Sequence, residues 1–103
     1  MVKDYHELNV WQLSMNLCEK VYGLVREFPV DERFALCDQL RCAVISVPSN
    51  IAEGNGRNSR SEYAGFLSIA RGSVSEVQTQ LELAERFGYV SQIPNPKSQF
   101  PIT

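Results

Sequence analysis

The residues that most often carry out catalysis are sparse in this chain of 103 residues. Its single histidine, His6, lies near the N-terminus, so one residue would have to serve any Ser–His–Asp or Cys–His site. The Glu-x-x-His motifs of di-metal helical bundles are excluded as well, because Lys3 occupies the position three residues before His6. We therefore expect no catalytic residues and predict that the protein is not an enzyme.

The three cysteines do not suggest a metal or redox site either. Cys18, Cys37 and Cys42 show neither a C-x-x-C motif nor the spacing of zinc ligands, and each has apolar neighbours in the sequence. Such cysteines are typical of small buried side chains in a reducing compartment. The first residues lack the pattern of a signal peptide, and no apolar run approaches the roughly 20 residues of a membrane span. We expect a cytoplasmic protein without a metal, a cofactor or a membrane partner.

The most distinctive polar segment is residues 48–57, which read PSNIAEGNGR. One interpretation is structural: the proline kinks a helix, a glycine caps its end, and Asn50 and Glu53 satisfy the freed backbone groups. The other interpretation is a binding surface, which would consist of Arg41, Asn50, Glu53, Gly54, Gly56 and Arg57. In that case the two glycines would let a phosphate group approach backbone amides at the start of the next helix.

Three arginines are candidates for contacts with nucleic acid phosphates, namely Arg57, Arg60 and Arg71. Scattered arginines are also common as solvated or paired side chains at helix ends. The chain has a formal net charge of −2 and a pI near 5.3, which argues against a strong electrostatic attraction to nucleic acid. Nucleic acid binding is therefore the alternative prediction, after a role in assembly.

Apolar periodicity indicates three helices separated by polar or glycine-rich breaks. The first spans about residues 6–28 and has a wide apolar face, on which Trp11 is a packing or interface anchor. The second begins with Asp31 as its N-cap, kinks or breaks at residues 44–48 because of its proline, and ends with Gly54 in the left-handed conformation.

The third helix, residues 61–87, has the clearest pattern. Ser59 or Ser61 caps it. An unbroken seven-residue repeat, typical of helices that pack at a shallow angle, follows at Tyr63, Leu67, Ala70, Val74, Val77, Leu81 and Ala84. At 1.5 Å per residue this helix is roughly 40 Å long, which indicates an elongated bundle. The residues predicted to serve helix packing or contacts between copies are Trp11, Tyr63, Leu67, Val74 and Leu81.

After Gly88 the helical period stops, and residues 89–103 include three prolines. Residues that precede a proline favour extended conformations, so this part is expected to be irregular. The predicted organisation is a helical bundle domain of residues 1–90 followed by an irregular tail of residues 91–103. The 44% of hydrophobic residues is enough to fold most of the chain, because it provides the apolar surface that offsets the ordering entropy.

Several short segments of the sequence together match a known family. They are LNVWQ (8–12), FP (28–29), QLR (39–41), Ala43, SVPSNIAEG (46–54), GR (56–57), EY (62–63), FL (66–67), IA (69–70), GS (72–73), Glu76 and QL (80–81). On these residues the sequence resembles the 23S rRNA-intervening sequence proteins, also called four helix bundle proteins, which are encoded within ribosomal RNA insertions in some bacteria and widely elsewhere. The resemblance covers about residues 5–90, and NIAEGNGR is its most specific motif.

The resemblance implies an up-down antiparallel four-helix bundle that assembles as a ring, commonly a homopentamer, and no enzymatic activity is established for the family. A related branch, the accessory proteins of diversity-generating retroelements, is a basic pentamer that binds nucleic acid and a reverse transcriptase. Two features differ from the family pattern: Cys42 stands where arginine is usual, and the proline-containing tail stands where a fourth helix normally follows. The acidic pI also separates this chain from the basic branch.

We therefore predict an all-α fold, an up-down antiparallel bundle of the four-helix type with three long helices present and the last helix lacking. Because its apolar faces are wider than this chain can cover, we predict a homo-oligomer that self-associates through its first and third helices. The resemblance implies a bacterial protein. Its expected role is that of a non-enzymatic assembly or adaptor protein, whose partner is unknown. The alternative is an RNA- or DNA-binding oligomer that uses an arginine-containing loop surface.

Overall fold

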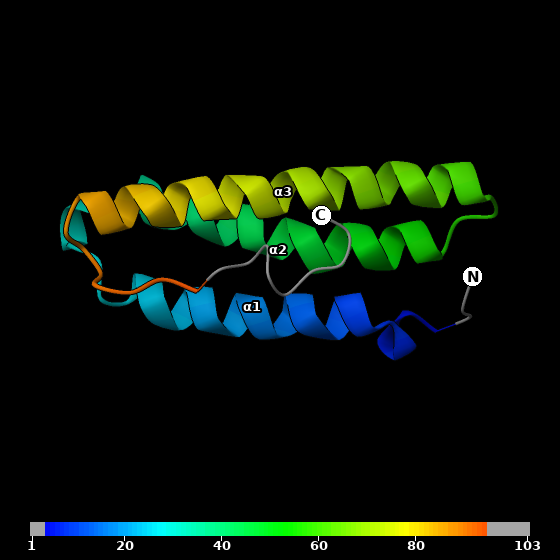
Figure 1. The fold of residues 1–103 in the computed structure, drawn as a ribbon, viewed down its shortest axis with the longest axis horizontal. Helices are drawn as coiled ribbons and strands as arrows, with labels where there is room; N and C mark the ends of the chain where they lie inside the picture. Colours follow the sequence, from blue (N-terminus) through cyan, green and yellow to red (C-terminus); the bar gives the residue numbers. More distant parts are fainter. Residues whose placement is uncertain (1–3, 95–103) are drawn as a thin grey trace.

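The structure is a computed structural model and describes residues 4–94. This part of the chain forms three α-helices, α1 (Asn9–Val25), α2 (Leu36–Asn55) and α3 (Arg60–Arg86), together with two 3₁₀ turns, η1 (Tyr5–Glu7) and η2 (Val30–Glu32). The helices run alternately up and down, and α2 packs against both of the others (Figure 1). The molecule measures 44 × 23 × 19 Å, as expected for long helices that lie side by side. The prediction of an all-α, up-down helical bundle is confirmed.

The first predicted helix is present but shorter than expected. A 3₁₀ turn occupies its predicted first residues, where the carboxylate of Asp4 accepts a hydrogen bond from the amide of His6 at 3.0 Å. The helix α1 begins only at Asn9. Its buried apolar side chains are Leu17, Val21 and Val25, which step by four residues along the predicted apolar face.

The predicted N-cap of the second helix is wrong. Asp31 lies inside η2 rather than at the start of α2, whose own N-cap, Ala35, makes no side-chain capping hydrogen bond. Pro29 restricts the backbone just before η2, and its carbonyl accepts a hydrogen bond from the amide of Glu32 at 2.9 Å. This local turn postpones the start of α2 to Leu36.

Of the kink or break expected at residues 44–48, the break does not occur, because α2 continues through Pro48. A proline has no N–H group, so the carbonyl of Val44, four residues earlier, loses its helical donor. The thiol of Cys18 on α1 donates to that carbonyl at 3.3 Å and replaces the missing hydrogen bond. Burial raises the pKa of Cys18 to about 11, so the thiol keeps its proton at neutral pH. The helix continues because its neighbour supplies a donor.

Gly54 is not the left-handed cap that the sequence suggested. The helix α2 continues to Asn55, and among the described residues a positive φ occurs only at Gly88. Close packing is what requires a glycine at position 54. A Cβ atom there would lie 2.7 Å from Cβ of Phe66 and 3.0 Å from Cδ1 of Tyr63, both on α3. The missing side chain therefore lets α2 and α3 approach closely at this end of the bundle.

The third helix agrees closely with its predicted pattern. Its N-cap is Ser59, whose hydroxyl accepts a hydrogen bond from the amide of Glu62 at 3.2 Å. The fully buried positions of the seven-residue repeat are Ala70, Val74, Val77, Leu81 and Ala84. Gly88, with a φ of 81°, ends the helix in a Schellman motif, in which the amide of Tyr89 donates to the carbonyl of Ala84 at 3.0 Å.

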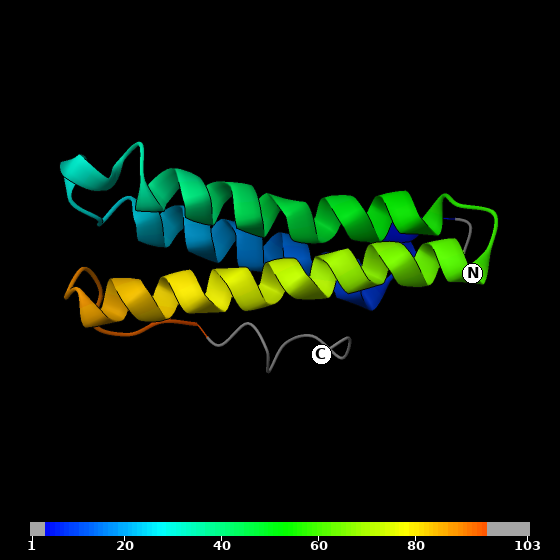
Figure 2. The same cartoon turned by 90° about the horizontal axis from the view of Figure 1, so that it is seen from above.

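Beyond α3 the chain turns back along the bundle on the side opposite α2 (Figure 2). Residues 89–94 form no helix, and their larger apolar side chains pack partly buried against the core. The hydroxyl of Tyr89 donates to Oε2 of Glu32 at 2.5 Å. This hydrogen bond raises the pKa of Tyr89 and ties the segment to η2. Residues 95–103, the rest of the predicted tail, lie outside the described residues.

Candidate functional site

The distinctive segment PSNIAEGNGR forms the end of α2 and the start of the turn into α3. Within it, a guanidinium nitrogen of Arg57 donates to Oε1 of Glu53 at 2.7 Å, four residues earlier. The guanidinium carbon of Arg57 also lies 4.8 Å from the centre of the Phe66 ring on α3. Arg57 thus connects the end of α2 with the first turns of α3. These contacts favour the structural interpretation of the segment.

Asn50 is also used inside the protein. Its amide nitrogen donates to the carbonyl and to the hydroxyl of Ser46, at 2.7 and 2.9 Å. The hydroxyls of Ser46 and Ser73 are 2.8 Å apart, so this polar network joins α2 to α3. A satisfied polar network in a helix interface specifies how the two helices pair.

The six residues of the predicted binding surface do not form one site. Glu53 and Gly54 lie in the last turn of α2, and Gly56 caps its end, but Arg41 lies in the second turn. The rise of the helix places Arg41 and the capping glycine about 20 Å apart. Arg41 instead donates to Oδ1 of Asp38 at 3.0 Å.

Of the three arginines predicted to contact nucleic acid, two lie on the same side of α3 and the third lies apart from them. Arg60 and Arg71 are exposed on α3, and their spacing of eleven residues puts them within about 20° of each other around the helix. They are roughly 16 Å apart along the helix axis. Arg57 precedes α3, where its guanidinium contacts Glu53 and Phe66.

The residues predicted for packing or for contacts between copies fall into two groups. Val74 and Leu81 are fully buried within the chain, which makes them packing residues here. Tyr63, Leu67 and Trp11 are half-buried. Trp11 lines an apolar groove of about 410 Å³ between η1, α1 and α2, which we call the tryptophan groove.

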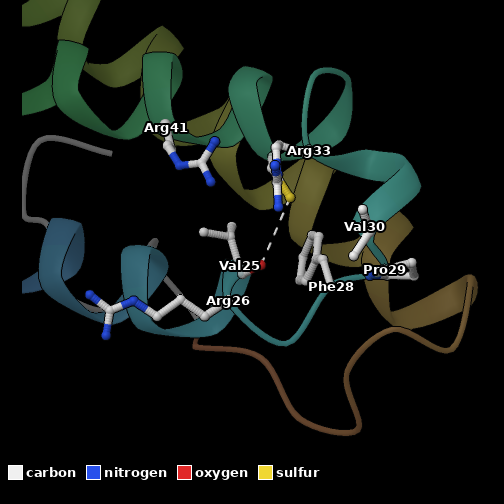
Figure 3. A pocket seen from close by; sticks show the side chains of 8 residues that line it. Val25, Arg26, Phe28, Pro29, Val30, Arg33 and Arg41 are labelled. Carbon is white, nitrogen blue, oxygen red and sulfur yellow. Dashed lines mark hydrogen bonds between the residues drawn. The ribbon is translucent and has the colours of Figure 1, made fainter.

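The structure reveals a second hollow that sequence reasoning missed. It has a volume of about 220 Å³ and lies between the end of α1 and the start of α2 (Figure 3). We call it the arginine hollow; its lining residues are Val25, Arg26, Phe28, Pro29, Val30, Arg33, Cys37 and Arg41. The signal in the sequence is the spacing of its three arginines by seven and eight residues across the break at Pro29. The spacing places the three arginines around one hollow only because the turn folds α2 back against α1.

Two further properties concern the part of the chain that the structure describes. Within residues 4–94, no group of three His, Cys, Asp or Glu side chains is placed to hold a metal ion. Over the same range, no helix combines the length and the apolar character of a membrane-crossing segment.

One of two comparisons with known proteins identifies a family. Among curated proteins, none matches the chain. The family profile described as 23S rRNA-intervening sequence protein matches residues 6–96, a range that includes all three α-helices and the turns between them. The chain therefore belongs to the 23S rRNA-intervening sequence protein family.

Proposed function

We propose that the protein is a non-enzymatic assembly module that acts as a homo-oligomer, with a pentamer as the form that the family resemblance implies. The observation that carries the proposal is a stripe of exposed apolar side chains on α3, the α3 stripe. It consists of Ile69, Leu83 and Phe87, whose exposed fractions are 54%, 39% and 55%. At 3.6 residues per turn they fall within about 40° around the helix. Leu83 and Phe87 are about one turn apart, and Ile69 lies on the same side about 21 Å from Leu83 along the helix axis. Exposed apolar side chains that gather on one side of a helix are typical of interaction surfaces.

The tryptophan groove offers a matching surface on the other side of α2. Two of its lining residues, Met15 and Ile45, are 41% and 45% exposed. The stripe and the groove are different surfaces of one chain, so a contact between them is heterologous. Heterologous contacts close into rings when the rotation between copies permits it. This geometry supports a ring rather than a two-fold dimer.

Several side chains of reactive or charged types have structural partners, which supports a non-enzymatic role. The thiols of Cys18 and Cys37 donate to backbone carbonyls of neighbouring helices. Arg57 and Glu53 are engaged with each other. These four side chains therefore hold neighbouring segments of the bundle together.

Light scattering coupled to size-exclusion chromatography tests self-association. At micromolar concentration we expect a mass that is a multiple of 11.6 kDa. Ile69→Glu should raise the dissociation constant roughly tenfold or more, because a carboxylate in an apolar contact loses its hydration. Ser68→Glu adds the same charge at the next position, on another side of α3, and should leave the mass unchanged.

A clean 11.6 kDa monomer of the wild type would refute the proposal. Equal dissociation by the two glutamate variants would also contradict it, because the effect would then follow net charge and not the α3 stripe. Circular dichroism verifies that both variants keep their helices, since both positions are exposed.

Nucleic acid binding is the second candidate function, and the strip formed by Arg60 and Arg71 favours it. With two phosphate contacts per chain, affinity for a structured RNA should fall roughly tenfold when salt rises from about 50 to 200 mM. The double variant Arg60→Gln/Arg71→Gln should lose most of this salt dependence. A filter-binding titration measures both effects. No binding at the lowest salt, or unchanged binding by the double variant, would exclude this role for the strip.

A further inference from the structure

The arginine hollow takes no part in the proposed assembly, and its composition suits a small anion. Arg26 follows the end of α1, Arg33 follows η2, and Arg41 lies in the second turn of α2. In Figure 3, Arg33 and Arg41 reach from the α2 side toward α1, while Arg26 extends along α1 with its guanidinium directed away from the other two. None of the residues that line the hollow is acidic. The positive charges of Arg33 and Arg41 beside one hollow repel each other, and an anion bound between them offsets this repulsion.

Two of the carboxylates near the hollow, those of Asp38 and Glu32, are already engaged. Asp38 accepts a hydrogen bond from Nη1 of Arg41 at 3.0 Å, and both side chains are partly exposed. Oε2 of Glu32 accepts a hydrogen bond from the hydroxyl of Tyr89. Within residues 4–94, neither Arg26 nor Arg33 forms an ion pair. Because exposed ion pairs contribute little to stability, Arg41 can exchange Asp38 for a stronger anion at small cost.

The walls of the hollow strengthen its attraction for an anion. Val25, Phe28 and Pro29 are apolar and reduce the screening of the arginine charges by water. The thiol of Cys37 donates to the carbonyl of Val25 at 3.8 Å, and burial raises its pKa, so it adds no negative charge at neutral pH. The same carbonyl accepts the amide of Phe28 at 3.1 Å, which leaves it hydrogen-bonded without an external donor.

The size of the hollow limits what it can hold. Its volume of about 220 Å³ is below the roughly 300–1,000 Å³ of sites for drug-sized ligands, which favours one small group over a whole nucleotide. Guanidinium groups bind phosphate oxygens through pairs of parallel hydrogen bonds. We propose that the arginine hollow binds a phosphate group, with Arg33 and Arg41 as the principal donors and Arg26 at its edge. This site is independent of the self-association proposed above.

Titration of the full chain with inorganic phosphate at low salt tests the site, with the NMR signals of the arginine Nε–Hε groups as the readout. We expect saturable shifts at Arg33 and Arg41. Arg33→Gln should weaken phosphate binding roughly tenfold or more, because it removes charge-assisted hydrogen bonds. Asp38→Asn should strengthen binding, because Arg41 then has no competing carboxylate. The control Lys20→Gln removes one positive charge from the exposed surface of α1, outside the hollow, and should leave binding unchanged.

Equal weakening by Arg33→Gln and Lys20→Gln would overturn the proposal, because the attraction would then depend on net charge alone. Shifts that fail to saturate, or that appear equally at Arg86, would overturn it too. Arg33→Lys gives a second test that keeps the charge but loses the planar pair of donors, and we expect weaker binding. Circular dichroism of each variant verifies the helical fold.

A second titration distinguishes two sources of the phosphate group. It compares a short oligonucleotide that carries a 5′-phosphate with the same oligonucleotide without it. Tighter, Arg33-dependent binding of the phosphorylated form supports the site and identifies a nucleic acid end as its source. Equal binding of both, together with Arg33-dependent binding of inorganic phosphate, supports the site and identifies free phosphate.

Discussion

Gly54→Ala should lower the free energy of unfolding by about 1–3 kcal/mol, the usual cost of an overpacked core. The added Cβ atom would lie 2.7 Å from Cβ of Phe66, which real structures do not tolerate. The atom it meets is attached directly to the backbone of α3, so relief requires a shift of the helix. Urea denaturation followed by far-UV circular dichroism measures the change.

The control for this prediction has the opposite expected sign. Gly72 lies inside α3, and a Cβ atom there would meet nothing within 4 Å. Gly72→Ala should therefore raise the free energy of unfolding by roughly 0.5–1 kcal/mol, because alanine is the better helix former. Stabilisation by both substitutions would contradict the close approach of α2 and α3 at Gly54.

Leu81→Ala should have the larger effect, a loss of about 2–5 kcal/mol in the free energy of unfolding. Leu81 is fully buried in the core cluster that α1, α2 and α3 share. Truncation leaves a cavity that rigid helices cannot fill by collapse. For a domain with a total stability of about 5–15 kcal/mol, this is a large fraction, so we expect a clearly lower urea midpoint.

Leu83→Ala, two residues along the same helix, should behave differently. Leu83 is 39% exposed and belongs to the α3 stripe, so its truncation should change monomer stability by no more than about 1 kcal/mol. It should instead weaken self-association. Unfolding must be measured at two protein concentrations, because association makes stability concentration-dependent. A severe loss of stability in Leu83→Ala at low concentration would place this side chain in the core and contradict the stripe.

The sequence predictions were correct where the interacting residues are close together in the sequence, and they failed where other contacts competed. The buried repeat of α3 was predictable because residues that share a helix face recur with a fixed period. The cap at Ser59 was predictable because its partner, the amide of Glu62, lies three residues away. The wrong N-cap at Asp31 shows the limit of this approach. A neighbouring proline turn competed for the same residues, and local preference alone did not decide between them.

The candidate site was predicted less well than the fold. The segment that ends at Arg57 was identified as distinctive, but its side chains proved to bind one another and α3. The structure places Arg41 in the second turn of α2, away from the other five residues of the predicted surface, because residue type does not reveal which end of a helix meets which partner. The arginine hollow was missed for the same reason.

The sequence by itself determined the three helices, their order and the buried face of α3, since helix formation and apolar periodicity are local properties of the chain. Only the tertiary structure decided why Pro48 is tolerated, why position 54 must be a glycine, and where the three arginines of the hollow meet. Each of these depends on a partner from another element: the thiol of Cys18 on α1, Phe66 on α3, and the turn that brings α2 back beside α1. A contact between distant segments has no period in the sequence, so it appears only when the chain is folded.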